Sequence, residues 1–253
     1  MPTHDIIDNR REKLVDQISR ILTSTEAARF AVGYFFLSGL EGLAERLTDV
    51  KELRLLIGNT TNQETLEQLA EGYRRLELVA EAAEVQAYPK RTDVKQMAAD
   101  TAENIRIGIA LMDQTDESET LVKILVRMIE GKRLKVRVYT KGRMHAKAYI
   151  FDYRRDGRYE QGIAIVGSSN LTLSGVTHNT ELNVVVHGND NHTELVRWFD
   201  ELWNESQEFD ATLMQAMQQA WAIASVRPYD IYMKTLYALV KDRLEGADDK
   251  DIL

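Results

Sequence analysis

MHAKAYIFD, residues 144–152, is the stretch around which the rest of the chain is organised. It places a histidine and a lysine two positions apart among residues that favour strands. Because alternate side chains of a strand point to the same face, we expect His145 and Lys147 to point the same way, with Tyr149 continuing that face. The other face can pack into a core through Met144, Ala146, Ala148 and Ile150. A nucleophile or base beside a fixed cation suits chemistry on a phosphate.

A second polar segment, VGSSNLT at residues 166–172, follows downstream. A glycine and two serines directly after an apolar strand predict a turn at which the backbone can approach a ligand. Ser168 and Asn170 can both donate a hydrogen bond to an anionic oxygen. Glu181 comes eleven positions after Asn170 and opens the next expected strand. A carboxylate there could orient a histidine ring through one nitrogen and leave the other free to attack.

Together these segments resemble the histidine–lysine–aspartate motif of the phospholipase D superfamily. The matching residues are His145-x-Lys147 with Asp152, followed by residues 167–170. The eleven-residue step to Glu181 matches the nuclease branch of that superfamily. The wider context, over most of residues 28–186, resembles the phospholipase D-like domains of restriction endonucleases and those found ahead of bacterial helicases. This context includes residues 34–38, 55–59 and 167–172.

The resemblance implies a role for each matching residue. His145 would be the nucleophile that attacks phosphorus and forms a covalent phosphohistidine, which water later hydrolyses. Lys147 and Asn170, with Ser168 behind them, would bind the non-bridging phosphate oxygens and stabilise charge in the transition state. Glu181 would fix the tautomer of His145. The resemblance implies no metal ion and no other cofactor.

Asp152 is the aspartate of the motif, and the resemblance implies a structural role for it. The sequence departs from the compact family motif after this residue, because residues 153–159 are inserted before the glycine-serine turn. Asp156-Gly157 is a strong hairpin signal, so we expect an extended hairpin here. Its arginines, among them Arg154 and Arg155, could contact a substrate backbone, and an ordinary solvated hairpin is the alternative.

The chain has a single copy of the motif, and its N-terminal half has no histidine beyond His4. The family chemistry needs a second histidine to protonate the leaving oxygen. Members with a single motif obtain it by pairing two chains across a two-fold axis. The resemblance therefore implies a homodimer with one shared active site that contains His145 from both chains.

A run of basic residues without any acidic one leads into this stretch, from Lys132 to Lys147. In a chain of net charge −8 it is a local patch that could attract a phosphate backbone. A solvated strand face is the alternative reading. With the hairpin arginines, the predicted nucleic-acid-binding residues are Lys135, Arg137, Lys141, Arg143, Arg154 and Arg155.

The pattern of apolar residues predicts a mixed α/β fold of the phospholipase D type, with a largely parallel central sheet and helices on both faces. Strands are expected at 29–37 and 53–57, with a helix from Ser38 to about residue 48 between them, which is typical of a parallel pair. We expect a catalytic domain at residues 1–188 with a helical insertion around 62–131. A helical extension follows at 189–253, in which Pro228 begins the last helix.

Composition bounds the classes of function. The 253 residues are 44% apolar and 28% charged, as in ordinary globular proteins. The lack of cysteine excludes disulfides, thiolate metal sites and cysteine nucleophiles. The polar start of the chain predicts no signal peptide, and no apolar run approaches the roughly 20 residues of a membrane helix. We therefore expect a cytoplasmic protein with no membrane attachment.

The leading hypothesis is a metal-independent nuclease that cleaves DNA, or alternatively RNA, in a restriction, phage-defence or helicase-linked context. One alternative is a nucleic-acid-binding and dimerising module that no longer turns over. Another is a lipid phosphodiesterase or phosphatidyltransferase, disfavoured by the single motif and the missing membrane-insertion stretch. A zinc cluster of His178, His187 and His192 is disfavoured as well, because the spacing fits no standard site.

Overall fold

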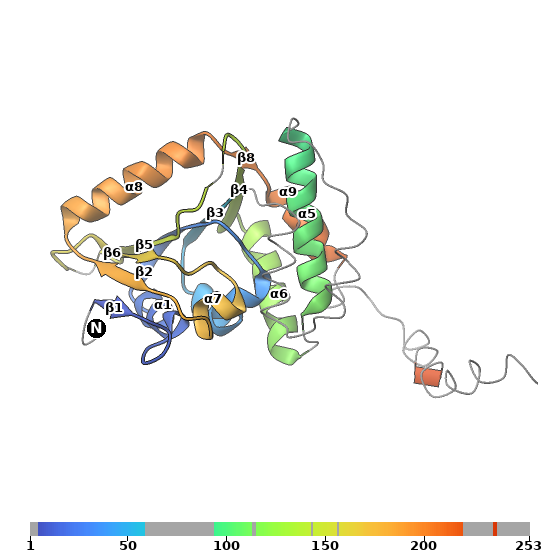
Figure 1. Cartoon of the computed structure of the whole chain (residues 1–253), viewed down its shortest axis with the longest axis horizontal. Helices are drawn as coiled ribbons and strands as arrows, with labels where there is room; N and C mark the ends of the chain where they lie inside the picture. The colour runs from blue at the N-terminus through green and yellow to red at the C-terminus, as the bar shows by residue number, and fades with distance from the viewer. Residues whose placement is uncertain are drawn as a thin grey trace, which may run out of the picture.

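The computed structural model describes residues 5–58, 94–112, 115–142, 144–155, 157–219 and 235–236. These residues form a central sheet with helices on both faces (Figure 1). α8 (Asn189–Asn204) covers one face, and most of the other helices lie on the opposite face. The other helices are α1 (Leu14–Leu22), the 3-10 helix η1 (Leu37–Leu43), α2 (Ala44–Leu47), α5 (Val94–Leu111), α6 (Asp116–Glu130), α7 (Leu173–Thr177) and α9 (Asp210–Gln218).

The sheet described has eight strands in the order β1-β7-β6-β5-β2-β3-β4-β8. β2, β3 and β4 run parallel to one another, and every other neighbouring pair is antiparallel. The strands are β1 (Ile6–Ile7), β2 (Thr25–Val32), β3 (Glu52–Gly58), β4 (Leu134–Tyr139), β5 (Ala148–Tyr153), β6 (Gly162–Gly167), β7 (Asn183–Val186) and β8 (Gln207–Glu208).

The mixed sheet with helices on both faces confirms the predicted fold class, but the prediction of a largely parallel sheet was wrong. The β2–helix–β3 unit is parallel as expected. A short connection joins β5 to β6, and such connections join neighbouring strands antiparallel. β7 follows after α7 and pairs antiparallel with β6 as well. β5 also pairs antiparallel with β2, so the antiparallel pairs outnumber the parallel ones.

Local contacts set the starts of two helices, and one of them differs from the sequence prediction. The segment from Ser38 begins as the 3-10 helix η1 at Leu37, and its N-cap, Phe36, offers no side-chain hydrogen bond. A Cβ on Gly39 would lie 2.5 Å from the Leu171 carbonyl, so only glycine lets this turn pack so closely. The first helix starts at Leu14, because Asn9 turns the chain with a φ of 55° and accepts a hydrogen bond from the Leu14 N–H.

Some predictions fall outside the described residues, among them the first part of the helical insertion, residues 62–93, and the start of the helix at Pro228. The domain boundary at residue 188 stays a prediction. α8, directly after it, packs on the sheet through Phe199 and Trp203, which are buried. No helix in the described part of the chain is long and apolar enough to cross a membrane.

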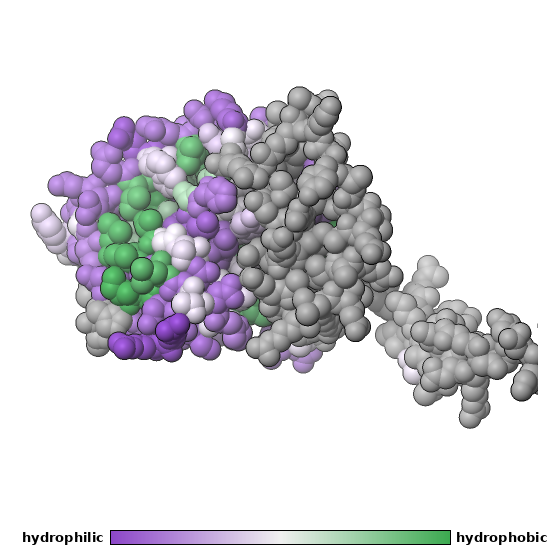
Figure 2. Space-filling model, viewed as in Figure 1, coloured by the Kyte–Doolittle hydropathy of each residue, from purple (hydrophilic) through white to green (hydrophobic). Residues whose placement is uncertain are grey.

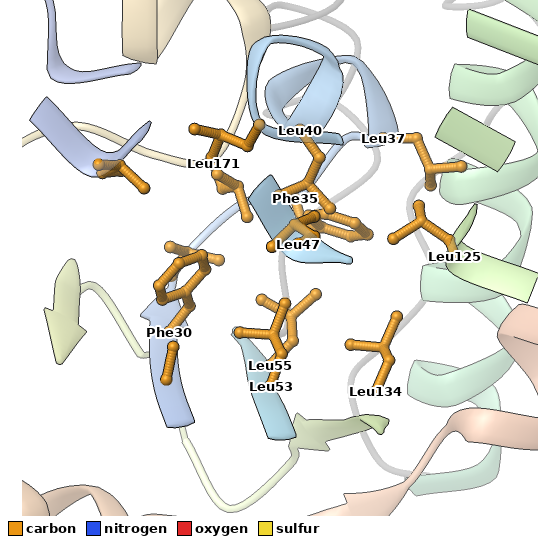
Figure 3. Packing of buried hydrophobic residues seen from close by; sticks show 14 of the residues in the cluster. Phe30, Phe35, Leu37, Leu40, Leu47, Leu53, Leu55, Leu125, Leu134 and Leu171 are labelled. Atoms are coloured by element: carbon orange, nitrogen blue, oxygen red, sulfur yellow. The ribbon is translucent and has the colours of Figure 1, made fainter. Parts of the chain in front are cut away.

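Two apolar cores lie on the two faces of the sheet. The larger one lies between the sheet and the helices α1, η1, α6 and α9, and Figure 3 shows part of it around Phe30, Leu55 and Leu125. The smaller one lies beneath α8. β5 alternates between them as expected for a strand, because Tyr149 enters the larger core and Ile150 the smaller one.

Candidate active site

Several strand ends meet at one end of the sheet. Ala31 near the end of β2 pairs with Ala148 at the start of β5, and Ala148 pairs with Val166 near the end of β6. Gly167 in turn pairs with Asn183 at the start of β7. The segments that precede β5, follow β6 and precede β7 therefore share this end. They carry all the predicted catalytic and phosphate-binding residues: His145, Lys147, Ser168, Asn170 and Glu181.

Lys147 and Asn170 lie against one small space beside the backbone of Gly33. A Cβ on Gly33 would lie 3.9 Å from Cε of Lys147, 3.3 Å from Oδ1 of Asn170 and 3.2 Å from the Met144 carbonyl oxygen. A Cβ on Gly58 would lie only 2.7 Å from the same carbonyl. The two glycines, at the ends of neighbouring parallel strands, thus let the loop before β5 approach the sheet. Sequence reasoning missed them as site residues.

The loop after β2 positions Asn170. The Tyr34 N–H donates a 3.0 Å hydrogen bond to Oδ1 of Asn170, and the Phe36 N–H donates one of 3.0 Å to the Leu171 carbonyl. Because the backbone satisfies the amide oxygen, Asn170 can offer its NH₂ group to an anionic oxygen. This is the donor that phosphate binding requires.

The Ser168 hydroxyl contacts Glu181. Its Oγ donates a hydrogen bond to the Glu181 carboxylate and accepts a 3.0 Å bond from the Leu182 N–H. The Ser168 N–H donates to the Leu182 carbonyl at 3.1 Å. In this structure the hydroxyl therefore fixes Glu181 at the start of β7, and the predicted contact of Ser168 with phosphate stays a prediction.

Lys147 is half-buried, and Glu181 is close enough to act on its charge. Burial lowers the pKa of Lys147, and the Glu181 carboxylate partly offsets that by raising it. Tyr149 follows at the bottom of the same face and is fully buried. Burial, with a smaller contribution from Glu181, raises the pKa of Tyr149, so its hydroxyl is a donor, and it donates to the Ser169 carbonyl at 2.9 Å.

His145 is exposed and lies in the loop just before β5, not within the strand as expected. The strand begins later because pairing with β2 begins at Ala148. Among the described residues, Glu181 accepts its hydrogen bond from Ser168, and none joins it to His145. The proposed roles of His145 as nucleophile and of Glu181 as its orienting group stay predictions.

Asn183 is a further residue that sequence reasoning missed. It is fully buried at the start of β7 and clamps Ser169, the centre of the glycine-serine turn. Its Oδ1 accepts from the Ser169 N–H at 3.3 Å, and its Nδ2 donates to the Ser169 hydroxyl at 2.9 Å. Asparagine is disfavoured in strands, and every other residue of β7 is valine. This unusual residue is the signal by which sequence reasoning could have found Asn183.

Asp152 lies at the other end of β5, in an ion-pair network. Its carboxylate is 2.6 Å from the guanidinium of Arg29, and Nε2 of His192 is 3.0 Å from its other oxygen. Burial raises the pKa of Asp152, but His192 and Arg29 together outweigh burial and hold the pKa below its ordinary value. This arrangement suits the structural role that the resemblance implies.

The predicted nucleic-acid-binding residues of β4 face α8. Nζ of Lys135 lies 2.6 Å from the Glu52 carboxylate. Arg137 donates to the Trp203 carbonyl at 2.8 Å, and its guanidinium lies 5.0 Å from the centroid of the Trp203 ring. Lys135 thus pairs with a charge on the neighbouring strand, and Arg137 helps to attach α8. The contact of either side chain with nucleic acid stays a prediction.

The other predicted basic residues lie in loops. Nζ of Lys141 is 3.5 Å from the Glu205 carboxylate. Arg154 donates to the Asp49 carbonyl at 3.4 Å. Arg155 is exposed on the hairpin after β5, and Arg143 lies outside the described residues. The hairpin itself is observed, with β5 and β6 antiparallel and Gly157 at a φ of +87°.

The three downstream histidines have separate neighbours. His178 hydrogen-bonds with Thr177, and Nε2 of His187 is 3.1 Å from the Asp5 carboxylate. His192 belongs to the network of Asp152. In the described ranges, no three His, Cys, Asp or Glu side chains gather as they would to bind a metal ion.

A family model described as the phospholipase D-like domain of cardiolipin synthase matches residues 18–203. The match runs from within α1 to the end of α8 and so includes the sheet and the candidate site. No curated protein is significantly similar to the chain.

Several solved structures are similar to the chain. One is Nuc from Salmonella typhimurium, a phospholipase D family member, with 13% identity and a TM-score of 0.40 over 76% of this chain and 88% of that one. NucT from Helicobacter pylori has 13% identity and a TM-score of 0.37 over 78% and 88%. Phosphatidylserine synthase from Haemophilus influenzae has 12% identity and a TM-score of 0.48 over 94% and 45%.

Proposed function

The chain belongs to the phospholipase D-like family, and we propose that it is a phosphodiesterase that cleaves DNA through a covalent phosphohistidine on His145. The observation that carries the proposal is the pair of donors beside Gly33. Lys147 and Asn170 lie against the same space at the end of the sheet that also carries His145. A cation and an amide NH₂ group placed together are suited to bind two non-bridging phosphate oxygens.

In the proposed reaction, a ring nitrogen of His145 attacks phosphorus. A P–N bond forms as the bond from phosphorus to the leaving oxygen breaks, and that oxygen takes up a proton from an acid. Water then attacks phosphorus, the P–N bond breaks and the water loses a proton. Lys147 and Asn170 stabilise the charge on the phosphoryl oxygens in both steps. The Ser168–Glu181 pair would set the local charge beside Lys147.

The acid would come from His145 of a second copy of the chain, because one chain supplies one copy of the motif. The described surface supports such a pairing with exposed apolar side chains next to Glu181. Leu182 is 58% exposed, and its neighbours Val184 and Ile6, which pair across β7 and β1, are 40% and 43% exposed. Figure 2 shows an apolar area on the surface below α8. A homodimer that shares one site would cover part of this apolar surface.

DNA as the substrate is supported by the sequence resemblance of residues 28–186 to the phospholipase D-like domains of restriction endonucleases. The eleven-residue step from Asn170 to Glu181 supports it as well, since it matches the nuclease branch. A restriction or phage-defence setting, or a helicase as a neighbouring domain or subunit, follows from the same resemblance. RNA is the second nucleic acid to test.

Cleavage of single- and double-stranded DNA in excess EDTA tests the proposal. We expect wild type to cleave and His145→Ala to lose cleavage. The matched control is His187→Ala, because His187 follows β7 at its opposite end and pairs with Asp5. If wild type and His145→Ala both bind DNA and neither cleaves it, an inactive binding module is favoured instead.

Phosphatidyl transfer is a second candidate, because the matching family model describes a domain of cardiolipin synthase. The same phosphohistidine would then be resolved by an alcohol instead of water. Incubation with phosphatidylcholine or phosphatidylglycerol in vesicles separates the two functions. Lipid turnover that requires His145, without DNA cleavage, would replace the nuclease proposal.

A further inference from the structure

The step of eleven positions from Asn170 to Glu181 passes through the short helix α7. The beginning of this step is held by its neighbours, because the loop after β2 binds the side chain of Asn170. Thr172 then caps the start of α7, since its hydroxyl accepts a 3.0 Å hydrogen bond from the Gly175 N–H. The end of the step, which leads into Glu181, needs a support of its own.

The end of α7 obtains this support from a distant part of the chain. In a regular α-helix the Asn179 N–H would bond to the Gly175 carbonyl, but here it bonds to the Ser174 carbonyl at 2.8 Å. The Gly175 carbonyl therefore needs another donor, as the last carbonyls of a helix do. Nδ2 of Asn9 donates to it at 2.9 Å and to the Asn179 carbonyl at 3.2 Å.

Asn9 is itself firmly anchored. It is buried, and its φ of 55° is a left-handed conformation that asparagine adopts more readily than most residues. Its N–H donates to the Glu12 carbonyl at 3.1 Å, and its Oδ1 accepts from the Leu14 N–H at 2.9 Å. The backbone and the amide oxygen are thus bound at the start of α1, and the amide NH₂ group binds the end of α7.

The strand before Asn9 holds the chain on the other side of Glu181. Ile7 in β1 pairs with Asn183 in β7, two positions after Glu181. Asn9 binds the carbonyl two positions before Glu181. Residues 7–9 therefore hold the chain on both sides of this carboxylate, which acts on the charge of Lys147.

We propose that Asn9 is a positioning residue of the candidate active site. By binding the end of α7, it sets where the Glu181 carboxylate lies relative to Lys147, and it acts through the chain without touching the substrate. Asn9 lies outside residues 18–203, which the family model matches. Its effect on cleavage rests on the proposed function, whereas its effect on the Lys147 ammonium group does not.

Two variants at residue 9 separate this role from that of a turn. Glycine adopts a φ of 55° without strain, so Asn9→Gly keeps the turn and removes the three side-chain hydrogen bonds described above. Asn9→Asp keeps the acceptor for the Leu14 N–H, but a carboxylate has no N–H to donate to the two carbonyls. The matched control is Asn189→Ala, because Asn189 joins the Gln161 N–H and the Tyr159 carbonyl at the opposite end of the sheet.

NMR of the whole protein with ¹³C-labelled lysine measures the pKa of Lys147, and Lys147→Arg assigns its signal. We expect Asn9→Gly and Asn9→Asp to lower this pKa, as Glu181→Gln does, because the carboxylate that raises it moves away. In DNA cleavage, both variants should lose about tenfold in kcat and keep KM within twofold of wild type. Asn189→Ala should keep the Lys147 pKa of wild type and a kcat within twofold.

Thermal unfolding checks that the variants fold, and Asn9→Asp carries both measurements if Asn9→Gly does not fold. The proposal is overturned if the folded variants keep the Lys147 pKa of wild type, or if Asn189→Ala lowers it equally. It is also overturned if wild type cleaves DNA and the Asn9 variants keep its kcat. If wild type cleaves no DNA, the proposed function fails, and the pKa of Lys147 still decides whether Asn9 positions Glu181.

Discussion

The two ends of the stretch 144–152 hold charged residues in opposite situations. Asp152 at its end is matched by Arg29 and His192, and both contacts are short. Lys147 near its start is half-buried, and Glu181 affects its pKa by electrostatic attraction without a hydrogen bond. His145 is exposed beside it. One short motif thus contains a charge with short ion-pair contacts and a charge that, in the proposed function, binds a phosphate.

This contrast separates residues that maintain the fold from residues that perform chemistry. A half-buried carboxylate held by an arginine and a histidine contributes to stability only while all three remain. A half-buried lysine that is short of partners is disfavoured in the free protein and becomes favourable when a phosphate binds. We therefore expect substitutions at the two ends of the stretch to affect different measurements.

The largest effect is expected for Lys147→Ala on cleavage. Losing the cation that is proposed to bind the phosphoryl oxygens should reduce kcat/KM by about 10³-fold or more. The midpoint of denaturant unfolding should stay close to that of wild type, because Lys147 forms no ion pair among the described residues. A variant that unfolds readily but keeps its activity per folded molecule would reverse the assignment.

Asp152→Ala should show the opposite pattern. It leaves Arg29 and His192 without their carboxylate, and we expect a loss of about 2–3 kcal/mol in the free energy of unfolding. Activity per folded molecule should remain near that of wild type. A loss of activity as large as that of Lys147→Ala, with unchanged stability, would contradict the structural role of Asp152.

The pairing of Asp152 with Arg29 and His192 also predicts how stability changes in acid. Because the folded state lowers the pKa of Asp152, its stabilising contribution is fully present above the ordinary aspartate pKa and is lost as pH falls below about 4. Asp152→Asn should remove this part of the acid sensitivity, as measured by unfolding between pH 5 and 2. An unchanged acid profile would mean that the pairing is not maintained in solution.

Asn183→Ala should affect both stability and cleavage, because Asn183 is buried in the fold and also positions the turn of the candidate site. It removes two hydrogen bonds to Ser169 and should cost about 1–3 kcal/mol of stability. Cleavage should fall about tenfold, because the turn that carries Asn170 would be misplaced. Asn183→Asp should restore less than half of the lost activity. His187→Ala is the control at the other end of β7. If the folded Asn183→Ala variant cleaves as well as wild type, Asn183 contributes to stability alone.

The smallest effect is on the alkaline side of the pH profile. Since burial lowers the pKa of Lys147, cleavage should decline at a lower pH than an ordinary lysine would give. Lys147→Arg should be less active but keep its residual activity to higher pH, because guanidinium does not lose its proton in this range. An identical alkaline limb in both proteins would assign that limb to another group.

The local patterns were readable from sequence, whereas pairing between distant segments was not. The alternation at β4 and β5 and the β5–β6 hairpin follow from period-two spacing and from Gly157. The antiparallel pairing of β5 with β2 depends on the path of a long connection, which short-range patterns do not encode. The prediction that the mixed sheet is largely parallel was wrong for that reason.

The residues of the candidate site were found by motif, but several of their contacts were not. Nothing in the spacing indicated that Ser168 would hydrogen-bond to Glu181 or that Lys135 would pair with Glu52. Such partners come from neighbouring strands at residues far apart in sequence. Gly33 and Asn183 were missed because their functions exist only in the packed loops.

The proposed function depends above all on the covalent bond between His145 and phosphorus. The most direct measurement is to quench a reaction in alkali, using DNA labelled so that the cleaved phosphate stays with the nucleophile, and to look for labelled protein after denaturation. We expect label on wild type that is stable in alkali, is lost in acid and is missing from His145→Ala. Equal labelling of His145→Ala, or cleavage by wild type without any labelled protein under conditions that trap the intermediate, would contradict it.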